Sequence, residues 1–271
     1  MTTYAIGDVH GQLEKLGGLL EGAGLTDAAG QWLGENSRLW FMGDLFDRGP
    51  NGIGVCDLVM RLEGEAARMG GFVGCLLGNH EPLILSTARF GRKKTAQGMS
   101  FRAFWLHNGG RLSDLSALTP EHTHWLERRP ALALEGETLL MHADSLFYLD
   151  YGDTLGGVNE AVGAVMMSED PRVWDELLGQ FSRRMEFWDP ELGERNLEKV
   201  LHSFGAARVL HGHTPISYLM DTDPEEVTGP LYYGGGRCTN LDGGMMYKSG
   251  HGFVYALPEL QTHESDGLPH L

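Results

Sequence analysis

Five short clusters of polar side chains, each directly after an apolar run, constrain the fold of this chain more than any other feature. The clusters occupy residues 7–11, 43–49, 78–81, 141–143 and 212–214. Side chains that follow the parallel strands of an open α/β sheet meet at the carboxyl edge of that sheet. Glycines in the clusters let the backbone turn sharply at the strand ends. The sequence therefore predicts that five strand ends converge on one site.

The first ninety residues alternate between strand-like and helix-like patterns. Apolar runs cover 2–8, 38–44 and 71–79, and apolar side chains recur at helical spacing within 13–23 and 55–69. A strand-helix-strand-helix-strand order predicts a parallel sheet with right-handed crossovers.

The second half of the chain combines a predicted hairpin with further helices and strands. Residues 131–143 read as two strands around a Glu-Gly-Glu turn. Residues 155–188 are predicted to be helical, with Asp170 as N-cap and an apolar stripe that runs from Trp174 to Trp188. Strands are also predicted in 231–238, 243–250 and 252–257.

Charge and cysteine usage exclude several classes of protein. The 37 acidic and 21 basic residues give a net charge of −16, which argues against a nucleic-acid or anionic-membrane partner. The three cysteines form no CxxC pair, which favours reduced thiols in a reducing compartment. No apolar run approaches the ~20 residues of a membrane span, and no basic segment precedes an apolar one near Met1. We therefore expect a cytoplasmic protein.

The donor types in the five clusters indicate two adjacent divalent cations. Any single cluster is typical of a cap or a turn, but five in order form a joint signal. Mixed carboxylate and imidazole ligands suit Mn, Fe or Zn better than Ca or Mg alone. Two ions ~3.5–4 Å apart need about seven contacts, which six residues supply if Asp44 bridges. The candidate ligands are Asp8, His10, Asp44, Asn79, His142 and His213.

Three of the motifs resemble those of the calcineurin-like metallophosphoesterases, most closely the PPP-type phosphoprotein phosphatases and their bacterial relatives. GDVHG, GDLFDRG and GNHE stand at 7–11, 43–49 and 78–81. HAD, GHT and WLHNGGRLSDL, at 142–144, 212–214 and 105–115, resemble further motifs of that family. The resemblance covers roughly 2–85 and 131–257.

The resemblance implies an α/β fold, a four-layer α/β/β/α sandwich with the metals at the sheet edge and with helical cap insertions. We expect one domain over 1–258, cap-like segments at about 86–130 and 145–190, and a loose tail at 259–271.

The resemblance also implies a role for each site residue. Asp8, His10 and Asp44 would hold the first metal, and Asp44, Asn79, His142 and His213 the second. The ions would be two divalent cations, manganese in the first place, with iron, zinc or nickel as alternatives. His80 would be the general acid and Asp47 would orient it. Arg48 would bind the phosphate oxygens through its planar fork.

Two positions depart from the pattern of the protein-serine/threonine phosphatases. Leu77 precedes GNHE where those enzymes usually carry arginine. A substitute phosphate-binding guanidinium would come from Arg195, from Arg183 or Arg184, or from the basic segment 89–102. His211 extends the last motif to HGH. This histidine would either contact the site or lie in a strand with its hydrogen bonds satisfied by neighbouring residues.

Three functions remain as hypotheses. The first is a phosphatase for phosphoserine and phosphothreonine that uses direct attack by a metal-bridging hydroxide, acting on a phosphorylated protein or a small phosphate ester. The second is a symmetrical diadenosine tetraphosphate hydrolase, which shares the pattern at 43–50 and a non-arginine residue before GNH. Those hydrolases generally lack the counterpart of Asp47 and carry GNHD, which favours the phosphatase. The third is a catalytically silent binding module of the same fold.

Overall fold

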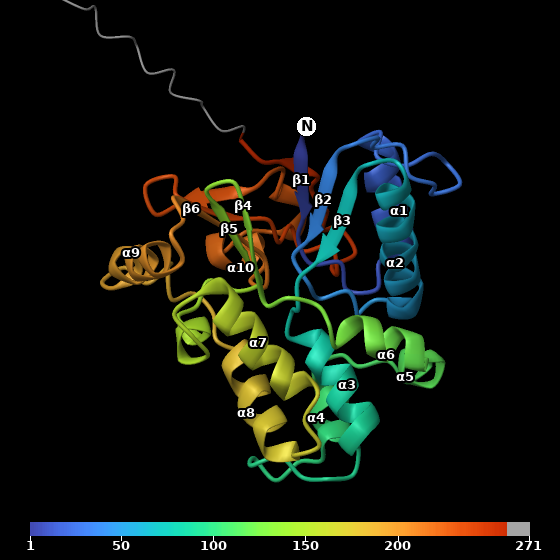
Figure 1. Cartoon of the computed structure of the whole chain (residues 1–271), viewed down its shortest axis with the longest axis vertical. Helices are drawn as coiled ribbons and strands as arrows, with labels where there is room; N and C mark the ends of the chain where they lie inside the picture. The colour runs from blue at the N-terminus through green and yellow to red at the C-terminus, as the bar shows by residue number, and fades with distance from the viewer. Residues whose placement is uncertain (259–271) are drawn as a thin grey trace, which may run out of the picture.

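The first of two mixed sheets contains the N-terminal strands. The computed structural model describes residues 1–258. The sheet order is β3-β2-β1-β9, and its members are β1 (Thr3–Ile6), β2 (Arg38–Phe41), β3 (Phe72–Cys75) and β9 (Tyr255–Ala256). The three N-terminal strands pair in parallel, and β9 runs antiparallel to β1. The connections contain α1 (Leu13–Gly22) and α2 (Gly52–Arg68), as the alternating pattern predicts (Figure 1).

The second sheet has the order β4-β5-β6-β8-β7. Its members are β4 (Leu132–Glu135), β5 (Thr138–Met141), β6 (Arg208–His211), β7 (Leu231–Tyr233) and β8 (Cys238–Asn240). Strands β4 and β5 form the predicted antiparallel hairpin, and β5, β6 and β8 are parallel neighbours. Strand β7 is antiparallel to β8 at the sheet edge.

Successive strand residues alternate between two hydrophobic cores, which shows that each sheet is covered on both faces. Ala5 and Trp40 share one core with Leu140 and Leu210 of the other sheet, so this core lies between the sheets. Their chain neighbours, among them Ile6, belong instead to the larger core that includes the helices. The four-layer α/β/β/α arrangement is therefore confirmed.

Most of the remaining helices lie beyond the carboxyl ends of the strands, below the sheets in Figure 1. They are α3 (His80–Phe90), α4 (Phe101–His107), α5 (Leu112–Ala117), α6 (Pro120–Leu126), α7 (Leu155–Met166) and α8 (Pro171–Phe181). Helix α9 (Gly193–Phe204) precedes β6, and α10 (Ile216–Met220) follows it. Short 3-10 helices span Phe147–Asp150 and Pro224–Glu226. No helix in residues 1–258 is both long enough and apolar enough to cross a bilayer.

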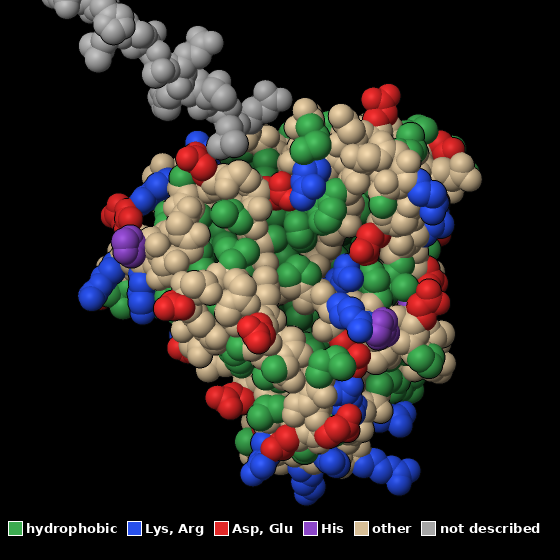
Figure 2. All heavy atoms as spheres, viewed as in Figure 1, with side chains coloured by type: hydrophobic (Ala, Val, Ile, Leu, Met, Phe, Trp, Pro, Cys, Tyr) green, Lys and Arg blue, Asp and Glu red, His purple; other side chains and the backbone are tan. Residues whose placement is uncertain are grey.

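The loop between α3 and α4 carries a basic cluster on the otherwise acidic molecule. Arg92, Lys93 and Lys94 are exposed in this loop. Figure 2 shows Lys and Arg side chains gathered at the lower end of the molecule, where this loop lies. His80 is the first residue of α3, and the loop begins at the other end of this helix. An eleven-residue helix is roughly 16 Å long, so the loop begins about that far from His80.

Two predictions of secondary structure are wrong. The helix predicted to reach Trp188 ends at Phe181, and Met185 adopts a left-handed backbone with φ of 64°. Asp144 explains this break, because its carboxylate and its carbonyl accept the N–H groups of Met185 and Glu186. Tertiary hydrogen bonds here override an apolar stripe that favours helix.

The strand predicted at 243–250 is instead a series of turns. The ammonium group of Lys15 in α1 donates to the carbonyl oxygens of Met245, Tyr247 and Gly250. Carbonyl groups that accept hydrogen bonds from one lysine do not form the regular hydrogen bonds of a strand, which explains why this segment forms turns and not a strand. The tail predicted at 259–271 lies outside the described residues.

Candidate metal centre

The six predicted ligands all follow the carboxyl ends of strands and all are buried. Asp8 and His10 follow β1, and Asp44 follows β2. The other three follow β3, β5 and β6, and these are Asn79, His142 and His213. The structure thus brings together residues that are up to 205 positions apart in the chain.

Left-handed backbone at non-glycine residues is concentrated in these loops. His10, Asp44 and His213 have φ values of 47°, 54° and 70°. Such conformations cost ~1–3 kcal/mol each and persist only where the surroundings impose them. Here the imposing contacts are hydrogen bonds from His10 N to the Asp44 carbonyl (2.8 Å) and from His213 N to Asp8 Oδ1 (2.9 Å).

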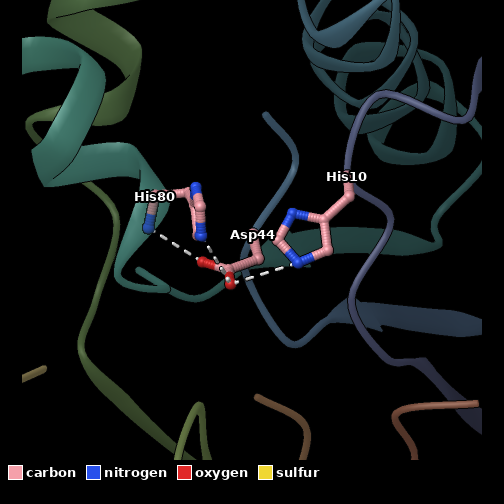
Figure 3. Close-up of side chains that lie close together, drawn as sticks. All are labelled: His10, Asp44 and His80. Carbon is pink, nitrogen blue, oxygen red and sulfur yellow. Dashed lines mark hydrogen bonds and ion pairs between the residues drawn. The ribbon is translucent and has the colours of Figure 1, made fainter. Parts of the chain in front are cut away.

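Asp44 lies at the centre of the donor atoms. Its Oδ2 atom is 3.6 Å from His10 Nε2 and 3.5 Å from His142 Nε2. Figure 3 shows the carboxylate between the rings of His10 and His80, whose Nε2 is 3.9 Å away. His80, predicted as the general acid and not as a ligand, therefore faces the same carboxylate.

A second group of donors converges on His142. Its Nε2 atom lies 3.0 Å from His213 Nδ1 and 3.2 Å from Asn79 Oδ1. The opposite ring nitrogen, Nδ1, donates to the Met42 carbonyl at 2.8 Å, which leaves the Nε2 lone pair directed at the group. His10 is oriented in the same way by the Phe46 carbonyl, 2.9 Å from its Nδ1.

The donor groups fit two divalent cations that share Asp44. Atoms that bind one ion at about 2.0–2.2 Å lie roughly 3 Å apart, as the donors around His142 do. Asp8 Oδ2 and His80 Nε2 are buried and have no hydrogen-bond partner within residues 1–258, which is costly unless a charge compensates. The two groups His10–Asp44–His80 and Asp44–His142–His213 each hold their donor atoms within 4.8 Å.

The electrostatics of the cluster also favour bound cations. Burial opposes ionisation of Asp44, but His142 and the other imidazoles hold its pKa well below the usual range. Burial, together with Asp242 and Asp44, raises the pKa of Asp8. Burial lowers the pKa of His213, so its ring favours the neutral form that binds metals.

His80 and Asp47 form a buried pair beside the first donor group. Asp47 Oδ2 lies 2.6 Å from His80 Nδ1, and the indole of Trp105 donates to Asp47 Oδ1 at 2.8 Å. Burial lowers the pKa of His80, but the carboxylates of Asp44 and Asp47 raise it by more, so the pKa of His80 is raised overall. The sequence patterns assign no role to Trp105, although it is the first residue of the WLHNGGRLSDL segment, which resembles a motif of the family.

Arg48 lies at the edge of the first donor group. Its Nη1 atom donates to His10 Nε2 at 2.8 Å and contacts Met246 Sδ at 2.9 Å. The left-handed Arg48 backbone donates to the Gly109 carbonyl at 2.8 Å. Gly109 has φ of 98°, and a Cβ there would meet Arg48 Cγ at 2.7 Å. The Asn-Gly-Gly turn thus packs directly on Arg48.

Glu81 belongs to the GNHE motif, but the sequence patterns assign no role to it. Its buried carboxylate accepts the N–H groups of Asp44 (3.0 Å), Leu45 (2.8 Å) and Gly78 (2.7 Å). Burial and Asp44 raise the pKa of Glu81 to about 7. The only signal in the sequence is its place directly after GNH.

The candidates for the guanidinium absent at Leu77 differ in position. The positive charge of Arg184 adds to burial in lowering the pKa of His142 and of His213. Its side chain is exposed and donates to the Ser182 carbonyl at 3.5 Å. Arg183 instead pairs with Glu186 at 2.7 Å. Arg195 is exposed on α9, and within residues 1–258 no hydrogen bond or ion pair joins it to the donor groups.

His211 is satisfied by its neighbours. Its Nδ1 lies 2.9 Å from the Gly212 carbonyl and its Nε2 lies 2.7 Å from the Tyr233 hydroxyl. Of the two explanations left open, the structure supports the strand histidine, because neither ring nitrogen contacts a donor atom of the site.

Comparison with known proteins places these motifs in a family. A family model described as calcineurin-like phosphoesterase matches residues 1–217. A symmetrical bis(5'-nucleosyl)-tetraphosphatase of Erwinia tasmaniensis is 30% identical over 71% of this chain and 61% of that protein. The Shewanella-like protein phosphatase 2 of Arabidopsis thaliana is 34% identical over 41% of this chain and 29% of that protein. The matches therefore span less than two thirds of either relative.

A solved structure supports the same fold. The crystal structure of a cold-active protein-tyrosine phosphatase from a psychrophilic Shewanella species has a TM-score of 0.69 and 23% identity. The match covers 93% of this chain and 73% of that one.

Proposed function

We propose that this chain, which belongs to the calcineurin-like phosphoesterase family, is a metal-dependent phosphoester hydrolase that removes phosphate from phosphoserine or phosphothreonine in proteins. The observation that carries this proposal is the buried His80–Asp47 pair, 2.6 Å apart beside the shared carboxylate of Asp44. Small phosphate monoesters would be accepted by the same site.

The proposed metal ligands are the six buried donors. Asp8, His10 and Asp44 would hold one ion, and Asp44, Asn79, His142 and His213 the other. When bound, two such ions supply a water of lowered pKa and withdraw charge from the phosphoryl group. Manganese is the proposed metal, and the same donor set accepts iron, zinc or nickel.

Two arginines would bind the phosphate oxygens. Arg48 lies beside His10, and its planar fork presents paired N–H donors. A guanidinium from Arg195, or from Arg184, whose positive charge contributes to lowering the pKa of His142, would replace the one absent at Leu77. Charge develops on the equatorial oxygens during transfer, where fixed cations are most effective.

His80 would protonate the leaving oxygen. Asp47 contacts its Nδ1 atom, so the proton available for transfer would be on Nε2, a buried nitrogen that has no hydrogen-bond partner in the described part of the chain. Trp105 holds Asp47 in turn. A carboxylate that fixes ring orientation and favours the imidazolium is the arrangement that general acid catalysis by histidine requires.

A symmetrical dinucleoside tetraphosphate hydrolase is the second candidate, and it has about equal support. The Erwinia relative bears that name and matches 71% of the chain. The non-arginine Leu77 favours it, whereas Asp47 favours the phosphatase. A catalytically silent module is disfavoured by the retention of every predicted donor in one buried cluster.

A side-by-side assay separates the candidates. The manganese-loaded protein is given a phosphoserine peptide and diadenosine tetraphosphate, and kcat/KM is measured for each. We expect the phosphopeptide to be preferred by about tenfold or more, a difference of roughly 1.4 kcal/mol in transition-state binding. The reverse preference establishes the second candidate. Hydrolysis of neither, with no metal retained under any supplementation, supports the silent module.

A further inference from the structure

The ammonium group of Lys15, on α1, holds the segment of turns that follows β8. Its Nζ atom lies within hydrogen-bonding distance of four backbone carbonyl oxygens, those of Met245 (2.9 Å), Tyr247 (2.6 Å), Lys248 (3.3 Å) and Gly250 (2.9 Å). A lysine ammonium carries three N–H donors, so the four carbonyls can engage all of them. Lys15 thus attaches to α1 the segment 245–250, which lies 230 to 235 residues further along the chain.

The backbone is held on both sides of Met246. The peptide group before it is held through the Met245 carbonyl, which accepts from Lys15. The peptide group after it is held through the Tyr247 N–H, which donates to the Gly244 carbonyl at 2.9 Å. Because peptide groups are planar, fixing these two also fixes the direction in which the Met246 side chain leaves the backbone.

Met246 contacts the guanidinium group of Arg48. Its Sδ atom lies 2.9 Å from Arg48 Nη1, the nitrogen that also lies 2.8 Å from His10 Nε2. A thioether sulfur is a weak but polarisable acceptor, and this one is on a half-buried side chain. The backbone of Arg48 is already fixed by the Gly109 carbonyl at 2.8 Å. Met246 therefore restricts the freedom that remains to Arg48, which is that of its long side chain.

We propose that Lys15 is a positioning residue that, through the segment 245–250 and the sulfur of Met246, orients the Arg48 guanidinium for the substrate phosphate. This inference rests on the proposed function, in which Arg48 binds phosphate. The ammonium group is the essential part, because Lys15→Met would keep an apolar stem but leave the carbonyls of this segment without their shared donor.

The test compares Lys15→Met with Lys248→Met, the same substitution at an exposed side chain of the same segment. For manganese-loaded Lys15→Met, we expect KM for a phosphopeptide and the Kd for inorganic phosphate to rise about fivefold, because the guanidinium is no longer pre-oriented. We expect kcat to change less than about twofold and metal content to stay unchanged, since no proposed ligand is altered. Lys248→Met should match the unmodified protein in every measurement. An unchanged KM and Kd in Lys15→Met would overturn the inference.

Amide exchange supplies a readout that does not depend on catalysis. In Lys15→Met, the N–H groups of Tyr247 and Gly250 should exchange faster, because the turns in which they bond are no longer held by the ammonium group. The N–H groups of β2 should be unaffected and serve as the internal reference. Unchanged exchange at both Tyr247 and Gly250 overturns the inference, even if the protein hydrolyses no phosphoester.

A double-mutant cycle identifies the side chain through which Lys15 acts. Met246→Leu keeps a side chain of similar size but removes the sulfur that contacts Arg48. In that background, Lys15→Met should change KM and the Kd for phosphate by less than about twofold, because the contact being positioned is absent. Fully additive effects would show that Lys15 acts elsewhere and would overturn the inference.

Loss of folding and failure of the proposed function give different results from failure of this inference. If Lys15→Met does not fold, Met246→Leu alone tests the link to Arg48, and an unchanged Kd for inorganic phosphate in that variant overturns the inference. An unmodified protein without phosphoester hydrolysis would instead refute the proposed function, while amide exchange still decides the role of Lys15.

Discussion

Asp44 is the residue on which both donor groups depend. Its Oδ2 atom is within 3.9 Å of three imidazoles, and its Oδ1 atom accepts the N–H of His80 at 2.9 Å. No other carboxylate in residues 1–258 belongs to both candidate groups. We therefore expect the charge on this one side chain to determine whether two cations are held together.

Asp44→Asn is expected to lower phosphoester hydrolysis at least about a hundredfold, because the amide cannot bridge two cations with the same charge. Aryl phosphate turnover and elemental analysis measure the two consequences. Asp153→Asn, at an exposed position, is the matched control. Activity retained within about threefold in Asp44→Asn would dismiss the site.

His80→Ala tests general acid catalysis through the leaving group. With phosphoserine, a poor leaving group, kcat should fall ~10²–10⁴-fold. With p-nitrophenyl phosphate, which leaves without protonation, the loss should be less than about tenfold. An equal loss for both substrates would mean that His80 serves as a ligand, the alternative suggested by its distance of 3.9 Å from Asp44 Oδ2.

At the scale of elements, the site is a set of strand-to-loop junctions that are tied to one another. Glu81, at the start of α3, accepts N–H groups from the loop after β2 and from the loop after β3. Strand pairing alone aligns β2 with β3 up to Phe41 and Cys75. Beyond that point, the carboxylate of Glu81 keeps the two loops in register.

Glu81→Gln should destabilise the fold by about 1–3 kcal/mol, because one of three buried N–H groups then faces an amide donor. Urea unfolding of the metal-free protein measures this loss, and Glu160→Gln on the exposed side of α7 is the control. Equal midpoints for the two variants would contradict the role assigned to Glu81.

The elements that follow local patterns were predictable, and those set by distant contacts were not. The hairpin β4–β5 and the alternation of strands and helices before residue 90 follow from side-chain periodicity. The end of α8 at Phe181 depends on Asp144, which is 41 residues from Met185. The turns at 243–250 depend on Lys15, more than 200 positions away.

The same distinction applies to the site. Motif spacing predicted all six donors, because each of them lies beside a glycine or directly after a strand. The contacts of Trp105 and Tyr233 could not be predicted, because their partners, Asp47 and Asp144, are 58 and 89 residues away in the chain. Local sequence carries no record of such contacts.

At the scale of the whole molecule, cation binding and folding stability should be coupled. The cluster buries the carboxylates of Asp8 and Asp44, and Asp242 adds another whose pKa burial raises to about 6. Ligands that bind only the folded state stabilise it by mass action.

Saturating manganese should therefore raise the melting temperature by roughly 5–10 °C, which corresponds to about 2.7 kcal/mol at a hundredfold excess over Kd. Differential scanning fluorimetry, with and without a chelator, measures the shift. Asp44→Asn should show little of it. A shift of the same size in Asp44→Asn would place the bound ions elsewhere.

The donors begin at Asp8 and end at His213, and the strands that carry them pair across most of the chain. A nascent polypeptide still on the ribosome cannot complete the pocket until His213 has emerged. We therefore expect cations to bind late in biosynthesis, after the first of the proposed ligands have already been synthesised. By the same argument, we expect translation products that end before His213 to lack phosphoester hydrolysis.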